Sequence, residues 1–293
     1  MRDANKIKNG GLVFKTVFCL LLSVYTLLLL SLFFYAFVNS LKNSWEFMLD
    51  PIGFPKVWRW DNYSVLIKRL SMQADPLSPI YYIEHMFAGS LLYAFLGALA
   101  MTVATVMVAY ACSQFKCALS SIIYFIVIFI ISVPIVGALP SEMKMIKQLR
   151  FYNNVWSVFI LKYSFGSVYF LLLFEALRQV PKDYREAAEI DGASMFTVMG
   201  NIVLPMVKSI IGSIFLVQFI AFWNDYSTPM LYFPNVPNFS VGLIDFAFNT
   251  SGEIAEETFK LGACFIGTLP ILILFCVFQK RLMEGVSAGG IKG

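Results

Sequence analysis

The sequence predicts an all-α membrane protein with six transmembrane helices, and three observations support this prediction. Of the 293 residues, 59% are hydrophobic and only 14% are charged, whereas charged residues make up about a quarter of a typical soluble domain. The mean hydropathy is +0.73. The hydrophobic residues gather in long uncharged runs, each close to the roughly 20 residues that a helix needs to cross a bilayer. Residues 1–293 are therefore predicted to form a single transmembrane domain.

The first predicted helix covers residues 16–38, directly after a basic N-terminal segment. A signal peptide is the competing interpretation, but its apolar region would be shorter, about 7 to 15 residues, and would end in a small-residue cleavage site. We find no such site, so we expect a membrane span with its N-terminus inside the cell. Residues 40–85 are mixed polar and aromatic, which predicts an outer loop at headgroup depth.

The remaining uncharged runs predict five further spans. The six predicted spans are, in chain order, 16–38, 86–113, 117–141, 155–177, 209–232 and 261–279. Six crossings place both termini on the cytoplasmic side, together with the polar segment 182–205. Lys144, Lys147 and Arg150 fall on the predicted outer side, against the positive-inside rule, so the topology depends mainly on the uncharged runs.

The segment 181–205, PKDYREAAEIDGASMFTVMGNIVLP, begins with a polar island between very apolar stretches. Its leading Pro and central Gly predict a short helix over about 182–191. Tyr184, Ala187, Ala188 and Asp191 share one face of that helix at the i, i+3, i+4, i+7 spacing. This small, nearly flat face predicts a contact with another protein. The alternative is an ordinary loop helix that pairs its own charges at i, i+4, but such pairs explain neither the two alanines nor the glycine.

These residues resemble a known motif, the EAA loop in the permease subunits of ABC importers. The residues that match the motif are Glu186, Ala187, Ala188, Asp191, Gly192, Ala193, Leu204 and Pro205. The C-terminal sequence QKRLMEGVSAGGIKG resembles the end of the smaller, second permease of maltose-type importers, a carbohydrate importer family. The resemblance implies the type I ABC importer permease fold. It also implies that the segment 182–205 is a cytoplasmic loop that couples this chain to ATPase subunits.

The resemblance further implies the partners and the location of the chain. The expected partners are a second permease in a heterodimer, two ATPase subunits, an extracellular solute-binding protein and membrane lipid. The expected location is the bacterial cell membrane, and the expected role is half of a translocation path. The sequence contains no GxxxxGK[ST] loop, so we expect ATP and Mg²⁺ to bind the partner ATPase and this chain to hold no cofactor.

Four polar or aromatic residues are candidates for the substrate path. Lys162 lies within a predicted span, where a charge costs about 2.5 to 3.5 kcal/mol at the helix centre, so it either reaches toward the interface or lines a path with Asp225. Trp223 either stacks on a sugar ring or packs internally. Asn224 completes the WND triplet at 223–225, which also looks like a feature of the family's fifth helix.

Other functions are less compatible with the sequence. A single histidine and five cysteines without metal-site spacing predict no metal centre, and no basic cluster of the kind nucleic acid requires is present. An integral membrane enzyme would need a cluster of catalytic groups that scattered acids do not supply. A permease for another solute, such as glycerol phosphate or a peptide, and an ion-driven secondary transporter stay open as alternatives.

Overall fold

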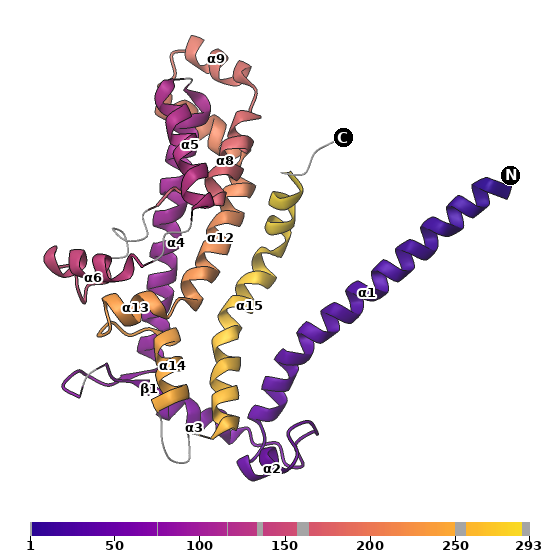
Figure 1. The fold of residues 1–293 in the computed structure, drawn as a ribbon, viewed down its shortest axis with the longest axis vertical. Coiled ribbons are helices and arrows are strands. Elements are labelled where there is room, and N and C mark those ends of the chain that lie inside the picture. Colours follow the sequence, from indigo (N-terminus) through magenta and orange to yellow (C-terminus); the bar gives the residue numbers. More distant parts are fainter. Residues whose placement is uncertain are drawn as a thin grey trace. The chain divides into compact units, whose positions relative to one another are not determined.

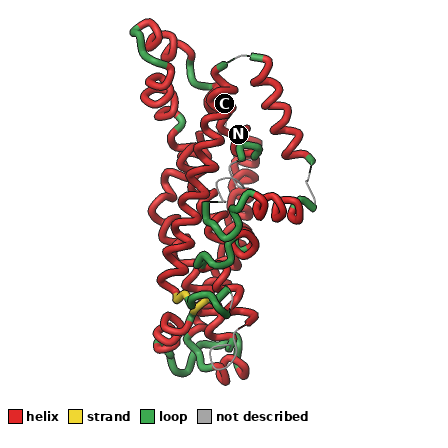
Figure 2. The backbone as a smooth tube through the Cα atoms, turned by 90° about the vertical axis from the view of Figure 1, so that its left-hand side faces the viewer, coloured by secondary structure: helices red, strands yellow, loops and turns green. Residues whose placement is uncertain are grey.

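The computed structural model describes residues 2–74, 76–115, 117–133, 137–156, 164–249 and 256–288. Nearly all regular structure in these residues is helical, with one pair of very short strands (Figure 2). The chain divides into two compact units. The N-terminal unit comprises Met1–Leu70 and Asp245–Leu269, and the core unit comprises Ser71–Ile244 and Pro270–Gly293.

The N-terminal unit is organised around the end of the first helix. Its helices are α1 (Arg2–Ser40), α2 (Ser44–Leu49), α3 (Asp61–Arg69) and the start of α15 (Glu257–Ala288) (Figure 1). Phe265 of α15 packs against Phe33 and Phe37 of α1, with ring centroids 5.0 and 4.9 Å apart. The Asn62 side chain donates to the carbonyl oxygens of Ser40 and Lys42. Aromatic packing and capping of the α1 carbonyls therefore hold this unit together.

The core unit contains the remaining elements. They are β1 (Ser71–Met72), β2 (Tyr81–Tyr82), α4 (Ile83–Gln114), α5 (Ala118–Ser132), α6 (Leu139–Gln148), α8 (Val168–Arg178), α9 (Lys182–Ile190), α10 (Met195–Val198), η1 (Met199–Val203), α11 (Leu204–Met206), α12 (Lys208–Asn224), α13 (Ser227–Tyr232) and α14 (Phe239–Asn249). Both α14 and α15 contain residues of each unit. The strands β1 and β2 pair antiparallel, with Ser71 opposite Tyr82.

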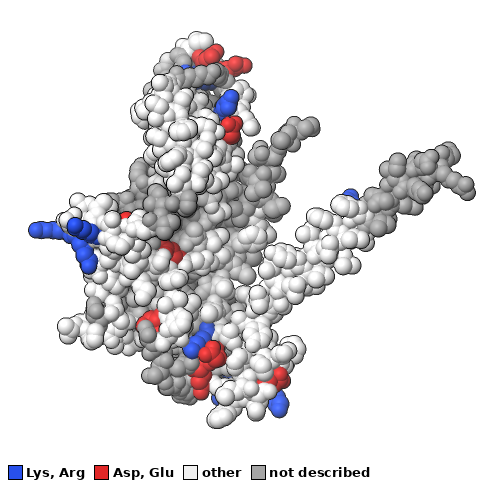
Figure 3. All heavy atoms as spheres, in the orientation of Figure 1, with Lys and Arg blue, Asp and Glu red and all other residues white. Residues whose placement is uncertain are grey.

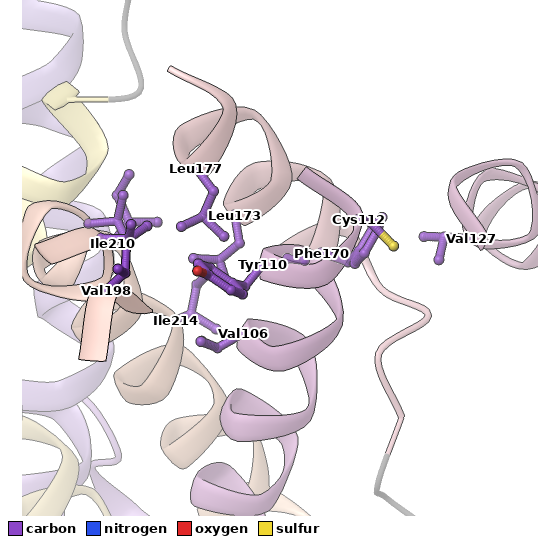
Figure 4. Close-up of a cluster of buried hydrophobic side chains, with 13 residues drawn as sticks. Val106, Tyr110, Cys112, Val127, Phe170, Leu173, Leu177, Val198, Ile210 and Ile214 are labelled. Atoms are coloured by element: carbon purple, nitrogen blue, oxygen red, sulfur yellow. The ribbon is translucent and has the colours of Figure 1, made fainter. Parts of the chain in front are cut away.

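The helix α4 is the centre of the core unit, and it packs most extensively against α12 and α8. At one end of α4, a buried cluster joins α4 to α5, α8, η1 and α12 (Figure 4). Val106 and Tyr110 of α4 meet Phe170 and Leu173 of α8 and Ile214 of α12 in this cluster. Such close packing makes the elements move together, because a filled core has few alternative arrangements.

The glycine at position 97 permits the closest approach of α4 to α12. A Cβ atom built there would lie 2.8 Å from the ring of Phe222. We therefore expect Gly97→Ala to push α4 and α12 apart and to destabilise the protein by about 1 to 3 kcal/mol, the usual cost of overpacking. The apparent melting temperature of the purified protein measures this effect. Gly212→Ala on α12 is the matched control, since a Cβ atom there would meet nothing within 4 Å.

Three helices are long and apolar enough to cross a membrane among the residues that the structure describes, or four if one bent pair counts as a span. They are Phe14–Ser40, Ile83–Gln114 and Glu257–Gln279, and they coincide with the predicted spans 16–38, 86–113 and 261–279. The bent pair joins Met195–Met206 to Lys208–Asn224 at 78°. Six crossings of the membrane stay a prediction.

The other predicted spans are interrupted. In 117–141, α5 ends at Ser132 because Val133, whose φ and ψ are −108° and 108°, is extended ahead of Pro134. In 155–177, the described helix is α8, which begins at Val168, and residues 157–163 lie outside the described part. The segment 209–232 is not one continuous helix, because α12 ends at Asn224 and α13 begins at Ser227.

Candidate functional site

The predicted short helix is α9, which spans Lys182–Ile190 and ends within one residue of the predicted position. Its end is a Schellman cap: the Ala193 N–H donates to the Ala188 carbonyl at 2.9 Å, and Gly192 adopts φ +78°. The following turn begins α10, where the Ser194 hydroxyl accepts from the Thr197 N–H. The sequence therefore folds this segment into a helix that stops sharply and turns back.

The left-handed conformation of Gly192 gives a direct prediction. A side chain in this region costs roughly 1 to 2 kcal/mol, while the space around the position is open, since a Cβ atom added there would meet nothing within 4 Å. We expect Gly192→Ala to lower the melting temperature of the purified protein through backbone strain alone. Gly200→Ala is the control, because its surroundings are equally open and its φ is not positive. Equal melting temperatures for both variants would contradict the capping role.

One side of α9 is attached to the turn between α4 and α5. Arg185 donates to the Gln114 carbonyl at 3.2 Å and its guanidinium lies 5.8 Å from the centre of the Phe115 ring. The Gln114 side chain in turn donates to the carbonyl of Leu177, the last buried residue of α8. Ala188 packs against the buried cluster at the end of α4. The tip helix is thus fixed to the core by a hydrogen bond, a cation–π contact and apolar packing.

The other side of α9 is exposed and chemically mixed. The acidic residues Asp183, Glu186 and Asp191 are all exposed there, and Figure 3 shows acidic side chains gathered over α9. Ile190 and Phe196 expose 86% and 71% of their surface beside these acids. We define this surface, Asp183 to Phe196, as the tip surface. A polar-rimmed apolar patch of this kind is typical of a protein interface.

A cleft of about 860 Å³ adjoins the tip surface. Glu186 and Arg185 of α9 line it together with Arg178 of α8 and residues of the α4–α5 turn, including Phe115 and Ser120. The cleft therefore presents both signs of charge around an aromatic ring. This arrangement suits a protein partner with charged side chains of its own.

The last two residues of the predicted coupling set are Leu204 and Pro205, which begin the short helix α11. Leu204 is partly buried against the core cluster, whereas Pro205 is exposed at the first turn of α11. The π-helical turn η1 and Pro205 precede the 78° bend into α12, and both are common causes of sharp kinks. The tip surface therefore connects to α12 through this sharp bend at residues 199–208, which we call the elbow.

Three of the four residues predicted for the substrate path, Trp223, Asn224 and Asp225, lie in the described part of the chain, at and just after the end of α12. Trp223 is only 3% exposed and packs among Phe87, Phe219 and Phe239. This geometry agrees with the internal-packing interpretation, and stacking on a sugar stays a prediction. Asn224 is exposed, and its side chain donates to the Ile220 carbonyl. Lys162 lies outside the described residues.

Asp225 occupies a structural junction. It accepts hydrogen bonds from the Tyr93 hydroxyl at 2.8 Å, the Ser227 hydroxyl at 2.9 Å and the Thr228 N–H at 3.1 Å. The last two bonds cap the start of α13, and the first joins α12 to α4 across the core unit. A path role for Asp225 stays a prediction, and the observed geometry accounts for the residue without it.

A second cleft, of about 910 Å³, lies along α4, α12 and α15 within the core unit. Its lining is almost entirely apolar and includes Phe95, Phe215 and Phe219, with Lys208 and Ser209 at the start of α12. None of Trp223, Asn224 and Asp225 lines this cleft. Its apolar walls suit hydrocarbon or an apolar helix better than a hydroxyl-rich solute.

Several contacts that hold the site together could not be predicted from the sequence. Gln114 connects to Arg185 of α9 across 71 positions of sequence, and Tyr93 reaches Asp225 across 132. No local pattern identifies these pairs, because each depends on the packing of α4 against later helices. The only signal for the first pair is the place of Gln114 in the short polar turn between two apolar runs.

The fold and the tip surface define a class of protein: a membrane-spanning subunit that offers an exposed helix to a partner. Residues 101–287 match the family described as binding-protein-dependent transport system inner membrane component, and the chain belongs to this family. The prediction of an ABC importer permease is therefore confirmed. Such a chain is a transport subunit and not an enzyme, and it functions with a permease partner, an ATPase and a binding protein.

Individual relatives agree with the family. The chain is 26% identical to the probable starch degradation products transport system permease protein AmyC of Thermoanaerobacterium thermosulfurigenes, over 92% of this chain and 94% of that one. It is 24% identical to the arabinooligosaccharides transport system permease protein AraQ of Bacillus subtilis, over 96% and 97%.

A solved structure confirms the predicted type I permease fold. The similar chain comes from a bacterial ABC transporter involved in the import of the acidic polysaccharide alginate. The TM-score is 0.76 at 20% sequence identity, and the match covers 92% of this chain and 96% of that one. The family match and the curated relatives do not favour an ion-driven secondary transporter or a membrane enzyme.

Proposed function

We propose that this chain is the smaller permease of a bacterial importer for a sugar or an oligosaccharide. It forms a heterodimer with a second permease, two ATPase subunits bind the pair, and an extracellular binding protein delivers the solute. The proposal is supported by the names of relatives that match over nearly their whole length, which refer to starch degradation products and arabinooligosaccharides. A relative from Streptococcus mutans that is 32% identical over 47% of this chain is described as a multiple sugar-binding transport system permease protein.

The observation that carries the coupling part of this proposal is the tip surface. Ile190 of α9, Phe196 of α10 and the acids beside them are exposed, and α9 itself is attached to the core through Ala188 and Arg185. Leaving large apolar side chains in water is costly, at about 25 cal/mol per Å², so a partner that covers them gains binding energy. We infer that an ATPase subunit covers this surface, with Glu186 and Ala187 at the contact and Ala188 behind them against the core.

The attachment of α9 to the core also suggests how movement of the ATPase reaches the membrane helices. A displacement of α9 by the ATPase acts on the buried cluster through Ala188 and on the α4–α5 turn through Arg185. The elbow passes the same displacement to α12, which packs against α4 more extensively than any other pair of the described elements does. Closure of the ATPase pair therefore moves α4 and α12 as a body and changes access to the path between the two permeases.

We place both termini and α9 in the cytoplasm. The first span and the even number of proposed crossings support this orientation. ATP and Mg²⁺ bind only the ATPase subunits in this scheme, and this chain performs no covalent chemistry.

Reconstitution tests the proposed function. The chain is purified with its partner permease, ATPase and binding protein, placed in proteoliposomes, and supplied with radiolabelled maltooligosaccharides or arabinooligosaccharides. We expect uptake that requires ATP on the cytoplasmic side and the binding protein on the other. Uptake that persists without ATP and follows an ion gradient would contradict the proposal, as would turnover by the isolated chain.

A further inference from the structure

The helix α6 carries a compact basic face that the function described above does not use. Lys144 and Lys147 lie on α6 and Arg150 follows its end, and all three side chains are exposed. Figure 3 shows Lys and Arg side chains projecting together from the region of α6. We call these three residues the α6 basic face. These are the three residues whose predicted outer position breaks the positive-inside rule.

The α6 basic face has no internal partner that neutralises it. The only acid of α6, Glu142, accepts a hydrogen bond from the Tyr232 hydroxyl at 2.7 Å. Among the residues that the structure describes, Lys144 and Arg150 form no ion pair, and Lys147 lies over the ring of Tyr152 at 5.2 Å. Three like charges held close together repel one another, so an external anion is needed to balance them.

The position of α6 points to the membrane. The helix α5 has 15 residues, which corresponds to about 22 Å, less than the roughly 30 Å of a bilayer core. A helix of this length that starts at one interface ends short of the other, so α6, the next described helix, can lie near the second interface. In Figure 1, α6 projects sideways from α4, at a level well away from α9. A helix that projects from the side of the bundle is placed to reach surrounding lipid.

The apolar side chains around α6 agree with this position. Ile146 is fully buried and, with the Tyr232–Glu142 bond, fixes α6 to the bundle. Leu149, Tyr152 and Trp156 expose 51%, 41% and 58% of their surface. Basic residues combined with exposed apolar and aromatic side chains are the signature of a helix lying in a membrane interface. Tyrosine and tryptophan prefer the headgroup level for the same reason.

We propose that α6 is an interfacial helix whose basic face binds the phosphate groups of anionic phospholipids in the leaflet opposite α9. The apolar side chains enter the acyl region while Lys144, Lys147 and Arg150 meet the headgroups. Lipid binding there holds the α5–α8 connection at a fixed depth while α9 is displaced at the other end. The inference rests on the proposed function in one respect: a cytoplasmic α9 makes the leaflet that α6 contacts the outer one.

The test measures lipids retained by the purified complex. The complex is equilibrated with equal amounts of phosphatidylglycerol and phosphatidylcholine, and native mass spectrometry counts the lipids that remain bound. A basic residue near an anionic surface contributes about 1 kcal/mol, or roughly fivefold in affinity. We expect K144Q/K147Q/R150Q to reduce the enrichment of phosphatidylglycerol at least about fivefold. This readout does not depend on transport, so it stands even if the proposed solute class fails.

Two controls make the result specific. K56Q/R59Q/K68Q removes the same charge from exposed positions of the N-terminal unit and should retain wild-type enrichment. K144R/K147R/R150K keeps the charge on α6 and should also retain it, which would show that the charge sets the enrichment. Wild-type enrichment in the K144Q/K147Q/R150Q complex would overturn the proposal. Loss of binding-protein-stimulated ATP hydrolysis by that complex in vesicles of phosphatidylcholine alone would also overturn it, since the face would then bind the binding protein.

Discussion

Charge reversal at Glu186 is expected to abolish ATP-driven uptake. Glu186 is exposed on α9 and lines the cleft beside Arg178 and Arg185, so Glu186→Lys places three positive side chains around the proposed contact with the ATPase. Like charges brought together across an interface cost several kcal/mol, which corresponds to a loss of binding of at least about 100-fold. Uptake by proteoliposomes and co-purification of the ATPase with this chain are the two measurements.

The control for this variant is Glu84→Lys. Glu84 is an exposed acid in the first turn of α4, at the end of that helix opposite Gln114 and Phe115. We expect this variant to retain both uptake and ATPase binding, because the same change of charge occurs far from the tip surface. Normal uptake together with normal co-purification for Glu186→Lys would remove Glu186 from the proposed contact.

The second large effect is expected at Asp225. Replacing it with alanine leaves the Tyr93 hydroxyl, a buried donor on α4, without its acceptor, and also removes the cap of α13. Hydrogen bonds to a charged group contribute about 1.5 to 3 kcal/mol each, and an unsatisfied buried donor adds a penalty. We expect Asp225→Ala to destabilise the protein by roughly 3 to 5 kcal/mol. Its melting temperature should fall well below that of Asp225→Asn, which retains one acceptor oxygen.

A double-mutant cycle separates the structural role of Asp225 from a role in the path. If the Tyr93 bond carries much of the effect, Tyr93→Phe/Asp225→Ala should be clearly less destabilised than the sum of the single variants. An Asp225→Ala protein with wild-type melting temperature and no transport would support the path role and refute the structural one.

The sequence predicts the elements whose boundaries depend on local chemistry. Pro181 and Gly192 delimit α9, so its predicted and observed ends agree within one residue. The long uncharged runs likewise predict α1, α4 and α15, because a run of about 20 apolar residues indicates a membrane-spanning helix without reference to the rest of the chain. Glu186, Ala187 and Ala188 of the predicted coupling set lie on α9, and their contact with an ATPase stays a proposal.

Other features depend on contacts that no local pattern contains. The break between α12 and α13 follows from Asp225, whose partner Tyr93 lies on another helix. Trp223 looks like a binding aromatic in its own segment, yet Phe87 of α4 and Phe239 of α14 enclose it. The charges of α6 look like an exception to the topology rule until the exposed apolar residues beside them are located in space.

The most direct test of the account is site-specific photo-crosslinking from α9. A benzoylphenylalanine replacing Ile190, which is 86% exposed on the tip surface, is introduced into the assembled complex in intact cells, and Ile52 of the N-terminal unit, 87% exposed, is the control position. We predict a covalent product with the ATPase from position 190, sensitive to ATP, and none with the ATPase from position 52. Absence of an ATPase product from position 190, or labelling of that position by an impermeant reagent added outside the cell, would contradict the account.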